Sequence, residues 1–277
     1  MSKPEDSELL LAAKKGDNAA LERLLLRHQS QIYRFGMKMC GNPEDAKDVL
    51  QDSLLAMARS VRNFRGESSF STWLYSIARS FCVKKHRKSK FAPEERSLDT
   101  DVQSETAQME DSGRRPDAVF AAIEIQEVIE NAMRRLEPGH REVLILRDVE
   151  GLTAIEVGKV LGITVEAVKS RLHRARSLMR EFAAPALGIS LKQEAISKTS
   201  LCPDVVMMFS SHLEGDIDSS ACAAMERHVQ DCERCRHTCD SLKKTLSLCR
   251  AGSGTDVPSA VQESVRQALR SFLTLQA

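Results

Sequence analysis

The chain has 277 residues and a net charge of +1, with 42% hydrophobic and 29% charged residues. This length predicts two small domains and linkers, since a domain usually takes ~100–200 residues. Aliphatic residues are abundant while aromatic residues, glycine and proline are sparse, which favours an all-α fold over sheets. The charged start "MSKPEDSELL" lacks the apolar core of a signal peptide, and no apolar run approaches the ~18–20 residues of a membrane span. We therefore expect a cytoplasmic protein that does not contact the membrane.

Helical periodicity extends from about Asp17 to Lys90, where apolar residues recur every three to four positions. A Gly-Asn-Pro break at residues 41–43 separates two of these helices. The second helix begins "EDAKDVLQD", with carboxylates near its N-terminus, where the helix dipole favours them. Simple capping and a solvated face explain these carboxylates as well as a binding role does.

Residues 64–90, "FRGESSFSTWLYSIARSFCVKKHRKSK", combine aromatic residues with a basic end. They contain the only tryptophan, Trp73, and one of the two tyrosines, Tyr75. Aromatic rings offer flat surfaces to unstacked bases and a basic run follows phosphates, so the segment predicts contact with single-stranded nucleic acid. For Trp73 or Tyr75 taken alone, a place in the core is the better interpretation.

A change of composition separates this part of the chain from a second helical part. Residues 89–118 are polar and acidic and lack apolar periodicity, which indicates a flexible linker. Periodicity returns at residues 119–183, where Pro138 starts a helix and Gly151 ends it.

Residues 153–182 predict a helix-turn-helix. Thr153 and Glu156 form a capping box, Gly162 supplies a sharp turn, and Thr164 caps the next helix. That helix has an apolar stripe and directs a set of basic side chains outward, at Lys169, Arg171, His173, Arg174 and Arg176. A cationic helix of this kind fits the major groove of duplex DNA. A solvated amphipathic helix is the weaker alternative, because the turn, the cap and the one-sided charge agree.

Two segments resemble one bacterial family. "DAKDVLQDSLLAMARSVRNFRGESSFSTWLYSIARS" resembles region 2 of extracytoplasmic-function (ECF) sigma-70 factors, and "LEPGHREVLILRDVEGLTAIEVGKVLGITVEAVKSRLHRAR" resembles their region 4. The resemblance implies a region 2 domain at residues 1–88, a flexible linker at 89–118 and a region 4 domain with the helix-turn-helix at 119–183.

The resemblance also implies roles for residues. The surface that binds the clamp helices of the RNA polymerase β′ subunit would hold Asp45, Asp48, Gln51 and Asp52. The −10 element would be opened and held by Phe70, Trp73, Tyr75, Ser80 and the basic run Lys84, Lys85 and Arg87. The −35 element would be read by Lys169, Ser170, Arg171, Arg174 and Arg176. The sequence departs from the family at Ser80, where asparagine is usual, and at Gly158, where alanine is usual.

Six of the eight cysteines follow residue 200 and belong to a third module at residues 200–250. His228, Cys232 and Cys235 have helical spacing, and Cys202 upstream can complete a tetrahedral Cys₃His set. The pattern resembles the zinc-binding fold of anti-sigma factors, here fused to the sigma factor itself. We expect zinc at Cys202, His228, Cys232 and Cys235.

Three further cysteines of the module, Cys222, Cys239 and Cys249, are possible ligands. They allow a second soft-metal site, or another ligand set, that takes copper(I), cadmium or zinc. A buried thiol is usually only a small apolar residue, which is the better interpretation for Cys249 alone. The arrangement is similar to the cysteine-rich domain of CorE-like, metal-responsive sigma factors.

The last segment, residues 256–277, predicts an amphipathic helix with an apolar face. That face holds Val257, Val261, Val265, Ala268 and Phe272. Packing against the sigma domains and packing against the metal module are equally compatible with this pattern.

Together these features predict an all-α sigma factor for −35/−10 promoters, regulated by metal at its own C-terminal domain. Its expected partners are core RNA polymerase, through β′ and β, and promoter DNA; a separate anti-sigma factor stays an open question. One alternative is a sigma factor whose zinc site is structural, or releases zinc on oxidation. A second alternative is a helix-turn-helix regulator that acts without polymerase. An enzyme is not expected, because no nucleophile–base pair or phosphate loop is present.

Overall fold

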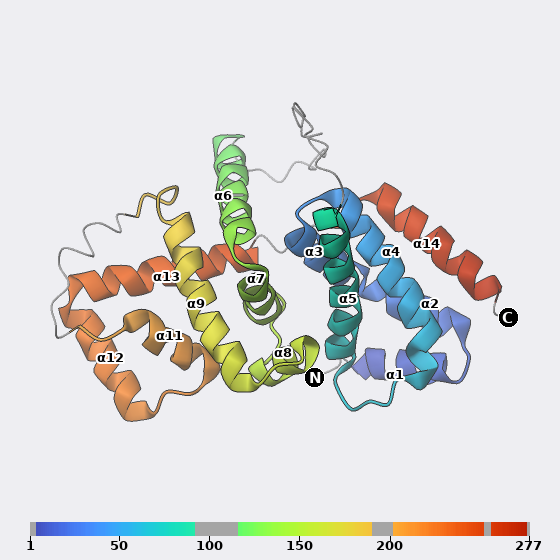
Figure 1. Cartoon of the computed structure of the whole chain (residues 1–277), viewed down its shortest axis with the longest axis horizontal. Coiled ribbons are helices and arrows are strands. Elements are labelled where there is room, and N and C mark those ends of the chain that lie inside the picture. The colour runs from blue at the N-terminus through green and yellow to red at the C-terminus, as the bar shows by residue number, and fades with distance from the viewer. Residues whose placement is uncertain (1–3, 92–115, 190–201, 252–255, 276–277) are drawn as a thin grey trace.

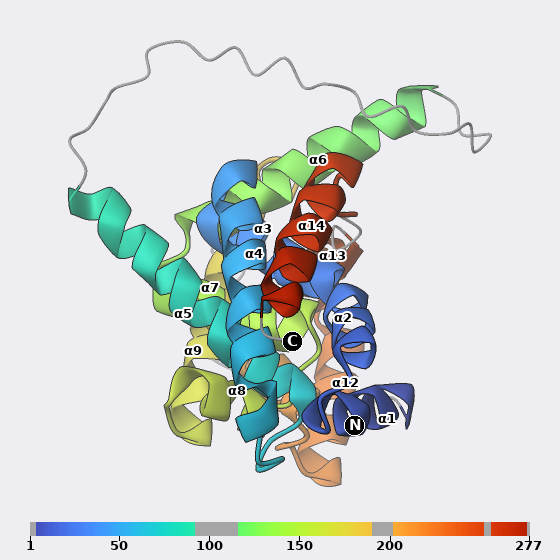
Figure 2. The same cartoon turned by 90° about the vertical axis from the view of Figure 1, so that its right-hand side faces the viewer.

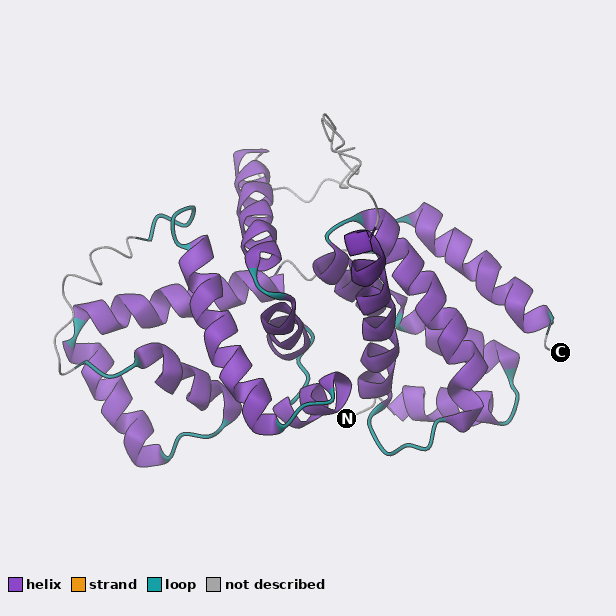
Figure 3. Cartoon of the chain, viewed as in Figure 1, coloured by secondary structure: helices purple, strands orange, loops and turns teal. Residues whose placement is uncertain are grey.

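The computed structural model describes residues 4–91, 116–189, 202–251 and 256–275. Every regular element in these ranges is a helix, as Figure 3 shows, which confirms the predicted all-α fold. None of these helices combines the length and the apolar character that a membrane span requires. The helices form an N-terminal bundle, a central bundle and a C-terminal module, which follow one another from right to left in Figure 1.

The N-terminal bundle contains α1 (Pro4–Lys14), α2 (Asn18–Arg27), α3 (Gln29–Cys40), α4 (Pro43–Ser60), the 3₁₀ turn η1 (Val61–Asn63) and α5 (Phe70–Phe91). The predicted break at residues 41–43 is confirmed. Gly41 ends α3 in the left-handed conformation, with φ 80°, and the Asn42 side chain accepts the Asp45 N–H to cap α4. Pro43 stands in the first turn of α4, where its missing N–H has no helical partner to lose.

The central bundle contains α6 (Pro116–Arg135), α7 (Pro138–Leu144), the π-helical turn η2 (Ile145–Val149), α8 (Ala154–Leu161) and α9 (Val165–Ala183). The Thr153–Glu156 capping box is present, with both reciprocal hydrogen bonds. Gly162 adopts φ 68°, and the Thr164 hydroxyl accepts the Ala167 N–H at the start of α9. The predicted helix-turn-helix is therefore confirmed, with a three-residue turn between α8 and α9.

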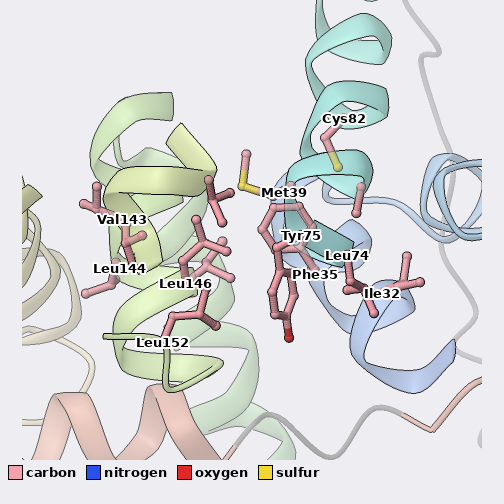
Figure 4. Packing of buried hydrophobic residues seen from close by; sticks show 14 of the residues in the cluster. Ile32, Phe35, Met39, Leu74, Tyr75, Cys82, Val143, Leu144, Leu146 and Leu152 are labelled. Carbon is pink, nitrogen blue, oxygen red and sulfur yellow. The ribbon is translucent and has the colours of Figure 1, made fainter. Parts of the chain in front are cut away.

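The two bundles share one apolar core. In Figure 4, Phe35, Met39 and Tyr75 of the N-terminal bundle stand opposite Leu146 and Leu152 of the central bundle. All five side chains are at most 4% exposed. Helix α5 extends to Phe91 and α6 begins at Pro116, so most of the predicted linker, residues 92–115, lies outside the described ranges.

The C-terminal module contains α11 (Val205–Glu214), α12 (Ser219–Asp231) and α13 (Glu233–Ala251). Helices α11 and α13 both pack against α9 of the central bundle. The module therefore covers the second helix of the helix-turn-helix, on the left of Figure 1.

The last helix, α14 (Ser259–Thr274), leaves the module and lies along α4 and α2 of the N-terminal bundle, as Figures 1 and 2 show. This decides between the two packing partners that the sequence allowed. The buried face differs slightly from the expected one, because Leu269 and Leu273 are buried with Val265, while Ala268 and Phe272 are only partly covered. The guanidinium of Arg59 lies over the Phe272 ring, 5.1 Å from its centroid.

Gly158 in α8 has a steric reason to be glycine. A Cβ at this position would lie 2.9 Å from the Ile163 carbonyl oxygen, closer than real Cβ contacts. The Gly158 carbonyl also accepts the N–H groups of Gly162 and Ile163, which holds the turn tightly against α8. Glycine at position 158 therefore leaves the room that this turn needs.

We predict that Gly158→Ala lowers the free energy of unfolding by about 1–3 kcal/mol through overpacking. Helix propensity alone would make the alanine variant more stable, by up to ~1 kcal/mol. The expected loss of stability is therefore opposite in sign to the effect of propensity. Chemical denaturation measures the change, with the exposed substitution Glu166→Ala as the control. A Gly158→Ala protein as stable as that control would contradict the steric account.

Candidate metal centre and nucleic-acid interfaces

The four predicted zinc ligands converge in the C-terminal module. The ligand atoms of Cys202, His228, Cys232 and Cys235 all lie within 4.8 Å of one another. The Cys202 and Cys232 sulfurs are 3.9 Å apart, and His228 Nε2 lies 3.1 Å from the Cys235 sulfur. With Zn–S bonds near 2.3 Å, two sulfurs of a tetrahedral zinc site lie roughly 3.8 Å apart, so the donor set fits zinc without large rearrangement.

Helix geometry brings these ligands together. His228 stands in the last turn of α12, and Cys232 ends that helix with an extended backbone, φ −112° and ψ 104°. Helix α13 starts at Glu233 and returns Cys235 to the same point, while Cys202 arrives from the segment before α11. Burial and the adjacent thiols of Cys232 and Cys202 raise the pKa of Cys235 to about 12. Such a group of thiols ionises readily only beside a bound cation, which is consistent with a metal centre.

The three further cysteines lie apart from this centre. Cys239 and Cys249 are buried, and burial raises the pKa of the Cys249 thiol to about 12. Cys249 belongs to the core where α13 meets the central bundle. Cys222 is half-buried on α12, and its sulfur lies 3.7 Å from His212 Nδ1. Within the described ranges, none of the three cysteines belongs to the Cys₃His group.

Arg176 of α9 is fully buried, so the expectation that it faces outward is wrong. Its Nε and Nη2 donate to the two Asp148 carboxylate oxygens at 2.8 Å each, and Nη2 also donates to Glu214 at 2.8 Å. Nη1 donates to the hydroxyl and the carbonyl of Ser210. All five N–H donors of the guanidinium therefore have acceptors. The expectation failed because α11, which carries Ser210 and Glu214, covers this face of α9.

The C-terminal module also contacts other cations of the central bundle. Arg147 Nε donates to the second Glu214 oxygen at 2.8 Å, and Lys169 Nζ lies 2.7 Å from the Asp216 carboxylate. Arg180 donates to the Ser241 hydroxyl on α13. Ser170 and Arg174 are exposed, and Arg171 is half-buried. Acidic and polar groups of the module thus occupy several of the basic positions on and beside α9.

The predicted −10 face of α5 is only partly open. Tyr75 is 1% exposed and its hydroxyl donates to Glu150 at 2.6 Å, so its ring lies in the core and not on a surface. Trp73 is half-buried against Phe64 and Phe70, with ring centroids 5.1 and 5.6 Å away. Ser80, Lys84 and Arg87 are exposed. The exposed part of this face is therefore its basic C-terminal half.

The predicted polymerase surface on α4 faces α5 through two of its carboxylates. Asp45 and Asp48 pair with Lys85 of α5, at 3.1 Å for Asp45, and Asp48 raises the pKa of Lys85. Gln51 is half-buried and Asp52 is exposed. An acidic group expected to bind polymerase is thus paired with a lysine expected to bind DNA.

Ion pairs also join the N-terminal and central bundles. Glu150, whose side chain is fully buried, accepts from Arg34 Nε at 2.7 Å and from Tyr75. Glu142 accepts two bonds of 3.1 Å from Arg79. Sequence reasoning missed these carboxylates, as it missed Glu214 and Asp216. Their partners are 38 to 116 residues away, and no local periodicity signals such pairs.

Three family models match the chain. Residues 24–91 match "Sigma-70 region 2", residues 126–179 match "Sigma-70, region 4", and residues 202–236 match "Putative zinc-finger". The two sigma matches cover most of the N-terminal and central bundles. The zinc-finger match contains Cys202, His228, Cys232 and Cys235.

Among characterised relatives, the ECF RNA polymerase sigma factor SigM of Mycobacterium tuberculosis is 31% identical over 172 residues, 62% of this chain and 81% of the relative. The ECF RNA polymerase sigma factor SigW of Bacillus subtilis is 29% identical over 170 residues, 61% of this chain and 91% of the relative. A solved structure of CnrH in complex with the cytosolic domain of CnrY is 25% identical and covers 64% of this chain and 96% of that chain, with a TM-score of 0.44.

The chain therefore belongs to the ECF sigma factors of the sigma-70 family. It is a sigma factor for transcription initiation and not an enzyme, and its C-terminal module carries a Cys/His cluster consistent with zinc. Sigma factors bind core RNA polymerase and promoter DNA. The more specific likeness to CorE-like factors stays a prediction.

We predict that Cys235→Ser abolishes stoichiometric zinc binding and unfolds the C-terminal module, because structural zinc supplies about 10 kcal/mol or more of folding free energy in small domains. Metal analysis of the purified protein measures the first effect, and the loss of helical signal in far-ultraviolet circular dichroism measures the second, because the module is built of helices. The control is His237→Ala, which removes an exposed histidine of the same helix outside the cluster. Equal zinc content in the two variants would contradict this assignment.

Proposed function

We propose that this ECF sigma factor is held in a closed state by its own C-terminal module, and that metal binding to the module controls its release. Zinc would be held by Cys202, His228, Cys232 and Cys235. When bound, zinc would fix the ends of α12 and α13 and the segment before α11 as one rigid unit. The observation that carries the proposal is the contact of Glu214 and Asp216 with the cations of and beside α9.

The first effect of the closed state is that the C-terminal module excludes DNA from α9. In the assigned role, Lys169, Ser170, Arg171 and Arg174 of α9 read the −35 element, with Arg176 added when α11 departs. A helix can enter the major groove only if its face is free. Since α11 and α13 pack on α9, the closed chain cannot place that helix in duplex DNA along the same face.

The second exclusion concerns the N-terminal bundle. We assign Asp45, Asp48, Gln51 and Asp52 to the β′ clamp helices, and Trp73, Ser80, Lys84, Lys85 and Arg87 to the −10 element. Helix α14 lies along α4, and α8 of the central bundle packs on α5. Ser69 at the start of α5 donates to Glu156 at 2.9 Å, which fixes α8 over this region. Core polymerase in the cytoplasm would therefore compete with α14 and with the central bundle for the same faces.

A metal can control this equilibrium only through different affinities for the closed and open states. Each 1.4 kcal/mol of difference between the free energies of metal binding to the two states changes the ratio of their populations about tenfold. The buried contact of Glu214 with two arginines suits an equilibrium between two states of similar free energy. A buried ion pair contributes little net stability, but the removal of one partner costs about 3–5 kcal/mol. A small displacement of α11 would thus have a large effect.

We predict that Glu214→Gln combined with Asp216→Asn raises promoter-directed transcription by reconstituted polymerase roughly tenfold in the absence of added metal, because weaker pairing with Arg147, Arg176 and Lys169 favours the open state. The control is Glu233→Gln, an exposed acidic residue of α13 whose ion-pair partner, His237, lies on the same helix.

The same transcription assay, titrated with zinc, cadmium and copper(I), tests metal control. The proposal expects one of these ions to change the output of the wild-type protein and to change that of the double variant much less. Equal output from all three proteins at every metal concentration would refute the proposal. A response to peroxide alone would replace metal control by the redox alternative.

A further inference from the structure

One face of α5 directs its hydrogen-bond donors at carboxylates of the central bundle. Ser69, at the start of the helix, donates to Glu156 at 2.9 Å, and the Thr72 hydroxyl donates to the same oxygen at 3.5 Å. Two turns further along, Arg79 donates to the two oxygens of Glu142 at 3.1 Å each. Residues three and seven positions apart lie on one side of a helix, so these three residues form a single donor face.

The donor face has the chemistry of an anion-binding surface. The acceptors that the central bundle offers to it are carboxylate oxygens. Arginine binds a phosphate with the same two parallel bonds that it makes to a carboxylate, and hydroxyl groups donate to either anion. Thr72 and Arg79 are roughly 10 Å apart along the helix axis, about three phosphate spacings of a stacked strand. The donor face can therefore follow the backbone of a nucleic-acid strand.

The donor face leads into the basic half of α5. Three exposed residues that we assign to the −10 element follow on the same helix, Ser80, Lys84 and Arg87. The Arg79 side chain is 30% exposed, so its pair with Glu142 lies at the edge of the contact between the two bundles. A strand bound along the basic half of α5 would meet Arg79 next.

We propose that the donor face binds the phosphate backbone of the single strand at the opened −10 element, and that Glu142 and Glu156 occupy the phosphate positions in the closed chain. Arg79 is then a DNA-binding residue that the closed chain masks. This inference rests on the proposed function only in requiring that the central bundle leaves α5 in the open chain, and it does not require a metal. If the ion pair only joined the bundles, its two members would have equal effects; on our proposal, Arg79 alone has a second role.

The test compares the two members of this ion pair in the full-length protein. Binding to a fluorescent oligothymidylate is measured by anisotropy over a range of salt concentrations. Glu142→Gln removes the competing carboxylate and keeps the arginine, so it should bind the strand roughly fivefold more tightly than the wild-type protein. Arg79→Gln opens the same contact but lacks the phosphate contact. It should bind more weakly than Glu142→Gln, and its slope of log affinity against log salt concentration should be shallower by about 0.7.

Two further variants separate closure from DNA binding. The charge swap of Arg79→Glu with Glu142→Arg restores an ion pair between the bundles but places a carboxylate on the donor face. It should therefore bind the strand more weakly than the wild-type protein. The control is Glu137→Gln, which removes the same charge from an exposed side chain beside α7 and should bind as the wild-type protein does.

Equal affinities and equal salt slopes of Glu142→Gln and Arg79→Gln would overturn the proposal and leave the pair a structural contact. Binding by the charge-swap variant as tight as that of Glu142→Gln would also overturn it, as would Glu142→Gln binding no more tightly than the control. None of these results bears on metal control, which the transcription assay tests separately. The expected difference between the two variants, without any metal effect on transcription, would support the donor face and refute metal control.

Discussion

The packing of the C-terminal module on α9 depends on the guanidinium of Arg176. Asp148 of the central bundle accepts two of its bonds, and Ser210 and Glu214 of the C-terminal module accept the other three. A fully buried arginine is tolerated only when its donors are satisfied and its charge is balanced. If α11 leaves, Asp148 still orients the guanidinium, while the other donors need new acceptors. Water or a DNA phosphate can supply them, so Arg176 is compatible with the open state that we propose.

The other contacts between the three groups of helices have the same character. Glu142 and Glu150 of the central bundle bind arginines of the N-terminal bundle, and Asp216 binds a lysine of α9. Ion pairs of this type contribute modestly to stability but depend strongly on geometry. An assembly held by several of them over a shared apolar core can separate in one step when polymerase and DNA supply alternative partners. That property is required of a sigma factor whose two DNA-binding regions must reach separate promoter elements.

The local parts of this structure were predictable from the sequence, whereas the contacts between distant parts were not. The capping box at Thr153, the turn at Gly162 and the grouping of His228, Cys232 and Cys235 depend on spacing within short segments, and the structure has them all. Cys202 joins the group from the segment before α11. The burial of Arg176 was not predicted, because it depends on helices that come from other parts of the chain, whereas a place in the core was already the better interpretation for Tyr75 alone. The helical wheel of α9 presents Arg176 as a solvated cation until α11 is placed beside it.

The central claim is that α11 covers α9 in the free chain and leaves it in the initiation complex. Hydrogen–deuterium exchange of the full-length protein, free and bound to core polymerase with promoter DNA, tests this claim most directly. The account predicts that amides of residues 205–214 are protected in the free protein and exchange faster in the complex, while residues 165–183 stay protected by DNA. Equal protection of residues 205–214 in both states, in a complex that initiates transcription, would contradict it.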